Sequence, residues 1–171
     1  MLNGLRLGLL GCGRIGGWVA RYGLAFGLSV VAYDPYLEVL PPGVERAWDL
    51  EGVLEQVDVL SVHVHLSDET RGLVSRVLLE RCKPGMLLIN TSRGAIVDEV
   101  ALLDGLRSGR IGGAGLDVLD GEPDIADHPL IAYAREHDNL LITPHCGGFS
   151  PDAVRIVCRH AAQKMLGVLR D

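Results

Sequence analysis

Three residues in the second half of the chain have side chains suited to acid–base chemistry and carboxylate binding. They are Arg93 before a glycine, Glu122 before a proline and His145 after a proline. A guanidinium can hold a carboxylate through two parallel hydrogen bonds, and an imidazole can donate or accept a proton near neutral pH. A carboxylate beside the imidazole orients it and stabilises its protonated form. This combination suits reduction of a 2-keto acid, in which the forming alkoxide needs a proton.

A second motif lies near the N-terminus, where residues 11–16 read GCGRIG directly after an apolar segment. In such a GxGxxG loop we expect Gly11 to permit a tight turn and Gly13 to let backbone N–H groups approach a pyrophosphate. Gly16 would let the following helix pack closely on the strand. The loop residues predicted to bind a dinucleotide are Gly11, Gly13, Arg14, Ile15 and Gly16.

Asp34 lies 18 residues after Gly16, at the end of a β-branched segment. This is near the spacing of ~20 at which an acidic residue accepts the ribose hydroxyls of NAD. Because no arginine stands beside Asp34 to bind a 2′-phosphate, we predict NAD rather than NADP. Two alternatives remain: Asp34 before Pro35 is also a common turn residue, and methyltransferases that bind an adenosyl cofactor combine a glycine loop with an acid.

These residues must be positioned by secondary structure, and short β-branched segments alternate with segments of helical periodicity along the chain. Strands are predicted at residues 5–10, 29–33, 58–62, 86–90, 112–116 and 140–143. Helices are predicted at residues 14–26, 50–56, 75–82, 98–108, 131–135 and from 150–151 to about 169. The alternation indicates an α/β fold with a doubly wound parallel sheet, the Rossmann-type dinucleotide-binding domain.

In an open parallel sheet, ligands bind outside the carboxyl ends of the strands. Three of the predicted strands are followed there by polar or glycine-rich loops, which we expect to open onto one edge. The candidate residues in these loops are Thr91, Ser92, Arg93, Asp117, Glu122, His145, Cys146, Gly147 and Gly148.

The same loops resemble three motifs of a known family, in order and spacing. They are LINTSRGAIVDE at residues 88–99, GLDV at 115–118 with Glu-Pro at 122–123, and TPHCGG at 143–148. They resemble the D-isomer-specific 2-hydroxyacid dehydrogenases, including their 3-phosphoglycerate dehydrogenase-like members. The resemblance implies NAD as the cofactor and hydride transfer to or from a D-2-hydroxy acid of the phosphoglycerate or a related type. It further implies catalytic roles for Arg93, Glu122 and His145, and places Asp117 at the nicotinamide carboxamide.

In this family a second domain, built from both chain ends, helps to bind substrate. The resemblance therefore implies that residues 1–171 form the NAD-binding domain, with the substrate domain absent from this chain. The retained catalytic residues favour an enzyme, here a domain with little activity alone. The missing half favours the alternative, a non-catalytic NAD-binding sensor or scaffold module. Individually, Arg93, Glu122 and His145 could also be a surface charge, a turn acid and a structural histidine.

The remaining histidines and cysteines gave weaker signals. His63 and His65 flank Val64 after the third predicted strand, where the family usually has proline at the position of His65. A zinc site formed by these two with Cys146 is a minor alternative, and we predict no metal. Cys12 is interpreted as a small apolar filler. The residues interpreted as surface histidines are His128, His137 and His160.

The composition limits the number of domains and the classes of function that are possible. The 171 residues suit one domain, and with 48% hydrophobic and 22% charged residues the chain can form a core, which excludes intrinsic disorder. A net charge of −6 argues against nucleic-acid binding, and no apolar run reaches the ~18 residues of a membrane span. The four cysteines lack CxxC spacing, which predicts reduced thiols in the cytoplasm. A small 2-hydroxy or 2-keto acid is the expected partner, together with a homodimer suggested by the family resemblance and the leucine-rich composition.

Overall fold

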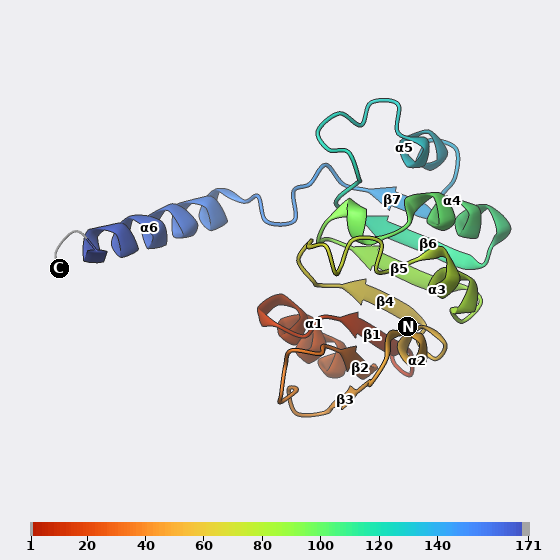
Figure 1. Ribbon diagram of the computed structural model, residues 1–171, viewed down its shortest axis with the longest axis horizontal. Helices are drawn as coiled ribbons and strands as arrows, with labels where there is room; N and C mark the ends of the chain where they lie inside the picture. The colour runs from red at the N-terminus through yellow and green to blue at the C-terminus, as the bar shows by residue number, and fades with distance from the viewer. Residues whose placement is uncertain (1, 169–171) are drawn as a thin grey trace.

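The computed structural model describes residues 2–168, which form a parallel sheet of seven strands in the order β3-β2-β1-β4-β5-β6-β7 (Figure 1). The strands are β1 Arg6–Leu10, β2 Ser29–Tyr33, β3 Val44–Arg46, β4 Val59–Val62, β5 Met86–Asn90, β6 Ile111–Leu116 and β7 Leu140–Ile142. The helices are α1 Arg14–Ala25, α2 Leu50–Leu54, α3 Arg76–Arg81, α4 Glu99–Ser108, α5 Pro129–Ala134 and α6 Pro151–Val168, with a 3-10 turn η1 at Gly94–Ile96. The predicted α/β fold with a Rossmann-type sheet is confirmed.

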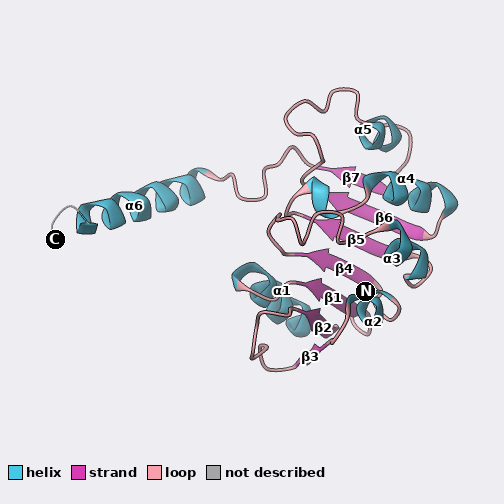
Figure 2. Ribbon diagram, viewed as in Figure 1, coloured by secondary structure: helices cyan, strands magenta, loops and turns pink. Residues whose placement is uncertain are grey.

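The register of the sheet brings the ends of six strands into line. The paired last residues are Leu10 with Tyr33, Leu10 with Val62, Val62 with Asn90, Asn90 with Leu116 and Leu116 with Ile142. The loops that begin after these residues therefore lie next to one another. Figure 2 shows them as pink segments at the arrowheads of the magenta strands. The predicted grouping of the three polar loops on one edge is confirmed.

Two elements differ clearly from the sequence-based predictions. The strand β3 was missed, since its three residues include two charged ones and it pairs only at the sheet edge, where short charged strands are common. Helix α5 begins two residues earlier than predicted, because His128 caps it and Pro129 takes its first position. Helix α6 begins at Pro151 as predicted; residue 169, its predicted end, lies outside the described residues.

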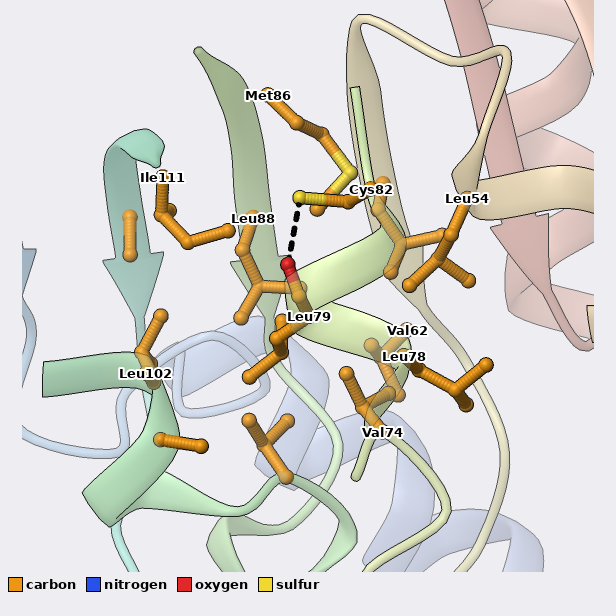
Figure 3. Close-up of a cluster of buried hydrophobic side chains, with 14 of the residues drawn as sticks. Leu54, Val62, Val74, Leu78, Leu79, Cys82, Met86, Leu88, Leu102 and Ile111 are labelled. Carbon is orange, nitrogen blue, oxygen red and sulfur yellow. Dashed lines mark hydrogen bonds between the residues drawn. The ribbon is translucent and has the colours of Figure 1, made fainter. Parts of the chain in front are cut away.

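The core lies mainly between the sheet and helices α2, α3 and α4 (Figure 3). Leu54, Leu88 and Ile111 are completely buried there, and the thiol of Cys82 donates a hydrogen bond to the Leu79 carbonyl at 3.0 Å. A smaller cluster of buried residues packs α1 against β1 and β2. Strands that are apolar on both faces explain why these segments of the sequence read as nearly continuous hydrophobic runs.

Some apolar surface remains open. The side chains of Leu87 on β5 and Leu141 on β7 are 42% and 67% exposed. Helix α6 extends away from the sheet, and all of its residues are exposed or half-buried (Figure 1). Within residues 2–168, no helix combines the length and apolarity needed to cross a bilayer.

Candidate active site

The glycine loop, residues 11–16, has the geometry that its sequence predicted. Gly11 has a φ of +85°, which only glycine adopts at low cost, and a Cβ there would meet the His63 carbonyl at 2.9 Å. A Cβ on Gly16 would lie 2.2 Å from the Gly11 carbonyl, so the start of α1 packs directly on the loop. Gly13 faces open space and is the N-cap of α1. The backbone N–H groups of the first helical turn thus point toward a site where an anion could bind.

Asp34, directly after β2, connects that strand to the glycine loop. Its Oδ2 accepts a hydrogen bond from the Cys12 N–H at 2.9 Å, and its Oδ1 accepts one from the Tyr36 N–H at 3.1 Å. Each oxygen keeps a free lone pair for a hydroxyl group. Cys12 itself is buried, as expected of a filler residue, and burial together with the Asp34 charge raises the pKa of its thiol.

Two adjoining cavities run along the carboxyl edge of the sheet. The first, about 340 Å³, is lined by the glycine loop, Asp34 and the segment after β4. The second, about 380 Å³, extends from Ile15 to the loop after β5. Both are lined by His63, Val64 and His65, so they form one groove across the sheet edge. An elongated molecule such as a dinucleotide could span this groove.

The loop after β5 presents Arg93 at the far end of the groove. The buried Asn90 fixes the loop, because its amide donates to the Arg93 carbonyl at 2.9 Å and its Oδ1 accepts from the Ser92 N–H at 3.0 Å. The hydroxyl of Ser92 donates to the Val62 carbonyl at 2.8 Å. The Arg93 guanidinium is exposed and donates to the Ser92 carbonyl at 2.6 Å, which leaves most of its donors available for an anion. Thr91 lines the same cavity.

His145 and Glu122 are in direct contact. The Nδ1 of His145 lies 2.6 Å from Oε2 of Glu122, and the side chains are 49% and 24% exposed. Oε1 of Glu122 accepts a hydrogen bond from the Leu119 N–H at 2.8 Å, which holds the carboxylate toward the ring. His145 has a φ of +50°, an uncommon backbone conformation for a non-glycine residue that tends to occur at functional sites. With Nδ1 held by a carboxylate, Nε2 is free to exchange a proton with a ligand.

Asp117 anchors the loop that carries His145. Its Oδ1 accepts from the Thr143 hydroxyl at 2.5 Å and from the Cys146 N–H at 3.0 Å, and its Oδ2 accepts from the Gly147 N–H at 2.8 Å. A Cβ on Gly147 would stand 2.9 Å from that carboxylate, so glycine is needed for the approach. Gly148 faces open space. Burial raises the pKa of Asp117, but the hydrogen bonds from Thr143 and the loop backbone outweigh it and hold the pKa below its ordinary value.

This shift predicts a contribution of Asp117 to acid stability. Because its pKa is lower in the folded state, the stabilisation is complete above the unfolded value of about 3.9 and disappears as the pH falls through the folded value. We expect Asp117→Asn to lower the free energy of unfolding by about 1–3 kcal/mol at neutral pH and to flatten its decline in acid. Denaturant unfolding measured across pH tests this. The pKa of Asp58 is also lowered, by its contacts with Lys83 and Arg6, so part of the decline of the free energy of unfolding in acid should remain in the variant. A decline as steep as that of the unmodified chain would contradict the prediction.

The structure corrects two sequence-based interpretations. His128 is not a surface residue, because its side chain is only 15% exposed and pairs with Glu99, whereas His137 and His160 are exposed as predicted. An arginine does lie beside Asp34, because the missed strand β3 pairs with β2 and brings in Arg46. Its guanidinium donates to three backbone carbonyls, those of Asp34 at 3.4 Å, Leu37 at 2.7 Å and Glu38 at 2.9 Å.

The segment after β4 contributes more to the groove than its sequence indicated. His63 is half-buried, its Nε2 lies 2.9 Å from the Ser61 hydroxyl, and burial lowers its pKa. His65, at the position where proline was expected, is exposed, and its carbonyl accepts from the Thr70 hydroxyl at 2.6 Å. Glu69 also lines the groove and accepts a hydrogen bond from the Tyr36 hydroxyl at 2.5 Å. Only the two histidines gave a signal in the sequence.

Comparison with known proteins places this geometry in a family. Residues 1–147 match the model of the D-isomer specific 2-hydroxyacid dehydrogenase, NAD binding domain. The chain belongs to this family. It is 37% identical over 172 residues to D-3-phosphoglycerate dehydrogenase of Bacillus subtilis, with 96% of this chain and 31% of that protein covered.

Solved structures support the same relationship. The NAD-complexed D-isomer specific 2-hydroxyacid dehydrogenase of Lactobacillus delbrueckii ssp. bulgaricus matches with a TM-score of 0.89 and 31% identity, over 97% of this chain and 53% of that one. A D-isomer specific 2-hydroxyacid dehydrogenase from Xanthobacter autotrophicus Py2, in complex with NADPH and MES, matches with a TM-score of 0.75 and 37% identity, over 82% and 44%. The chain thus spans about a third to a half of these relatives.

Proposed function

We propose that the chain is the NAD-binding domain of an oxidoreductase that transfers a hydride between NAD and a D-2-hydroxy acid of the phosphoglycerate or a related type. The observation that carries the proposal is the 2.6 Å contact between His145 Nδ1 and Glu122 Oε2 at the sheet edge that also holds the glycine loop. A histidine so oriented can exchange a proton at the strand ends, where Rossmann-type sheets bind their dinucleotide.

The chemistry of a 2-keto acid assigns a role to each polar group. Bound NADH supplies the hydride that adds to the carbonyl carbon. Arg93 binds the substrate carboxylate, and His145 donates its Nε2 proton to the oxygen that becomes the hydroxyl group. Glu122 stabilises the protonated ring before that transfer. In the oxidative direction, His145 would accept the hydroxyl proton at Nε2, and bound NAD would take up the hydride.

The same edge provides the proposed cofactor contacts. The N–H groups of the α1 first turn, including those of Arg14 and Ile15, would hold the pyrophosphate, and Asp34 the adenosine ribose. Asp117 retains a lone pair on Oδ2 for the nicotinamide carboxamide. The residues proposed to flank the nicotinamide end are Thr91, Ser92, Arg93, His145, Cys146, Gly147 and Gly148.

A preference for NAD over NADP follows from Asp34 and from the commitment of Arg46 to carbonyl groups. A 2′-phosphate ~4 Å from a carboxylate is repelled by up to about 4 kcal/mol at an effective dielectric constant of 20. We expect NAD to bind at least about tenfold more tightly than NADP, and Asp34→Ala to weaken NAD binding by about tenfold or more. Calorimetric titration with both cofactors measures these differences.

Two further variants make the titration decisive. Asp34→Asn keeps an acceptor for the Cys12 N–H but removes the charge, so its main effect should be tighter NADP binding. Asp104→Ala removes an exposed carboxylate on α4 and should change neither affinity. Equal binding of NAD and NADP by the unmodified chain would refute the preference, and unchanged NAD affinity in Asp34→Ala would refute the role of Asp34.

A non-catalytic NAD sensor or scaffold is the alternative function. It is favoured by the exposure of Arg93 and by the 49% exposure of His145, since a hydride-transfer site works best when water is excluded. The retained contact between Glu122 and His145 favours the enzyme, because a module that only binds NAD has no use for an oriented proton donor. The two functions make different predictions for turnover in a two-domain protein.

We also propose a homodimer, supported by the open apolar surface around β7. A groove of about 680 Å³ there is lined mainly by apolar residues of β7, α5 and the segment after β6, among them the exposed Leu141, and it is bordered by Glu122 and His145. We expect sedimentation coefficients to rise with concentration and Leu141→Asp to shift the equilibrium toward monomer. A monomer at every concentration tested would rule out the dimer.

The four unpaired cysteines support a cytoplasmic location.

A further inference from the structure

A second histidine–carboxylate pair lies outside the cofactor groove. Nε2 of His128 is 2.9 Å from Oε2 of Glu99, and the two side chains are only 15% and 11% exposed. Nδ1 of His128 accepts a hydrogen bond from the Leu130 N–H at 3.2 Å, so the ring proton sits on Nε2 and points to Glu99. The pair links the first residue of α4 to the cap of α5, and none of the proposed chemical steps uses it.

The other oxygen of Glu99 reaches the loop that carries Glu122. Oε1 of Glu99 accepts from the Asp120 N–H at 3.0 Å, two residues before Glu122. The preceding residue, Leu119, donates its N–H to Glu122. Glu99 therefore holds both ends of the segment 120–128, and Glu122 lies inside that segment.

The same segment also rests against the residue that follows Arg93. A Cβ on Gly94 would come within 2.0 Å of the Asp120 backbone nitrogen, so the two loops touch through their backbones. A displacement of Asp120 would thus disturb the neighbourhood of both Glu122 and Arg93. Glu99, the first residue of α4, holds Asp120 at this contact with Gly94 by accepting the hydrogen bond from the Asp120 N–H.

We propose that Glu99 is a positioning residue for the proposed catalytic pair, holding the Glu122 carboxylate in place for His145 through the Asp120 N–H and His128. The inference rests on the proposed function only for the importance of that pair. Burial raises the pKa of Glu99, whereas the Asp120 N–H and His128 act in the opposite direction. Burying a carboxylate costs free energy unless hydrogen bonds compensate it, and Glu99 is compensated by two donors, the Asp120 N–H and His128.

The tautomer of neutral His145 reports directly on this arrangement. Glu122 accepts from Nδ1–H, so it favours the Nδ1–H form over the Nε2–H form. The ratio of the two can be measured by ¹⁵N NMR of the histidine rings at alkaline pH in the 171-residue chain without cofactor. We expect Glu122→Ala to lower the ratio about tenfold, the effect of losing one hydrogen bond to a charged acceptor. Glu99→Ala should lower it at least about threefold.

A double-mutant cycle separates positioning from a direct effect of the Glu99 charge. If Glu99 acts through Glu122, Glu99→Ala combined with Glu122→Ala lowers the ratio no further than Glu122→Ala alone. His128→Asn, which keeps a capping acceptor but loses the contact with Glu99, should produce a smaller decrease. Glu99→Gln should retain one of the two bonds and recover part of the loss.

Asp104→Asn provides the matched control, because it removes an exposed carboxylate from the same helix. An unchanged tautomer ratio in both Glu99→Ala and Glu99→Gln, each with a native amide spectrum, would overturn the inference. So would an effect of Glu99→Ala that persists in full without Glu122. The tautomer ratio is measured without NAD, so an unchanged ratio would leave the proposed function standing. Failure of the NAD titration would likewise leave this inference standing.

Discussion

The 171-residue chain alone is expected to bind NAD yet to turn over 2-hydroxy acids about three orders of magnitude more slowly than a two-domain protein that contains it. Arg93 and His145 are exposed at the sheet edge, where water competes for them. Correct orientation of substrate and catalytic groups is worth roughly 7–11 kcal/mol, so losing half of it costs about a thousandfold in rate. Exclusion of water by a closing domain adds to this difference.

A chimera tests this expectation. This chain would replace the matching 31% of the Bacillus subtilis D-3-phosphoglycerate dehydrogenase, and both proteins would be assayed with NAD and a panel of D-2-hydroxy acids that includes 3-phosphoglycerate. Turnover by the chimera, with little by the chain alone, supports a cofactor domain of an enzyme. Robust turnover by the isolated chain would contradict the need for a second domain. A chimera that binds NAD and remains inactive would favour the sensor or scaffold.

In the active chimera, we expect His145→Ala to lower kcat by about 10²–10⁴-fold, the usual contribution of a positioned general acid. The reason is that the forming alkoxide would have to take its proton from water. Glu122→Gln should cause a smaller loss, because an amide can still orient the ring but does not stabilise its positive charge. Steady-state and single-turnover kinetics would separate the chemical step from cofactor release.

His137→Gln is the control for this series, because His137 is exposed and its Nδ1 lies 3.0 Å from the Tyr133 carbonyl, away from the groove. Arg93→Ala should mainly raise KM for the acid, because it removes a carboxylate contact made in both the ground state and the transition state. Activity that survives His145→Ala and Arg93→Ala together would refute the catalytic assignment.

Many residues of the groove could be predicted because they lie in short sequence motifs directly after predicted strands. The glycine loop directly joins β1 to α1, and the requirements for Gly11 and Gly16 follow from that short connection. The loops after β5, β6 and β7 could be placed on one edge because parallel strands that alternate with helices leave few topologies. The contact between Glu122 and His145 followed from the family resemblance, and the structure shows it at 2.6 Å.

What the sequence could not reveal depends on contacts between distant segments. Arg46 reaches Asp34 only because β3 pairs with β2, and a three-residue edge strand with two charges has little signal of its own. The burial of His128 depends on Glu99, which lies on another element. The hydrogen bond from Asn90 to the Arg93 carbonyl and the bond from the Gly147 N–H to Asp117 likewise form only when the strands pair in the folded sheet.

Binding of NADH at the carboxyl edge of the sheet can be mapped directly by amide NMR of the unmodified chain. If the carboxyl edge of the sheet is the cofactor site, saturating NADH should shift the resonances of Gly13 and Asp34 in the first cavity of the groove and of Ile15 and Thr91 in the second. Resonances of α6 should remain unchanged. Shifts confined to α5 and β7, or no saturable shifts, would contradict cofactor binding at this edge.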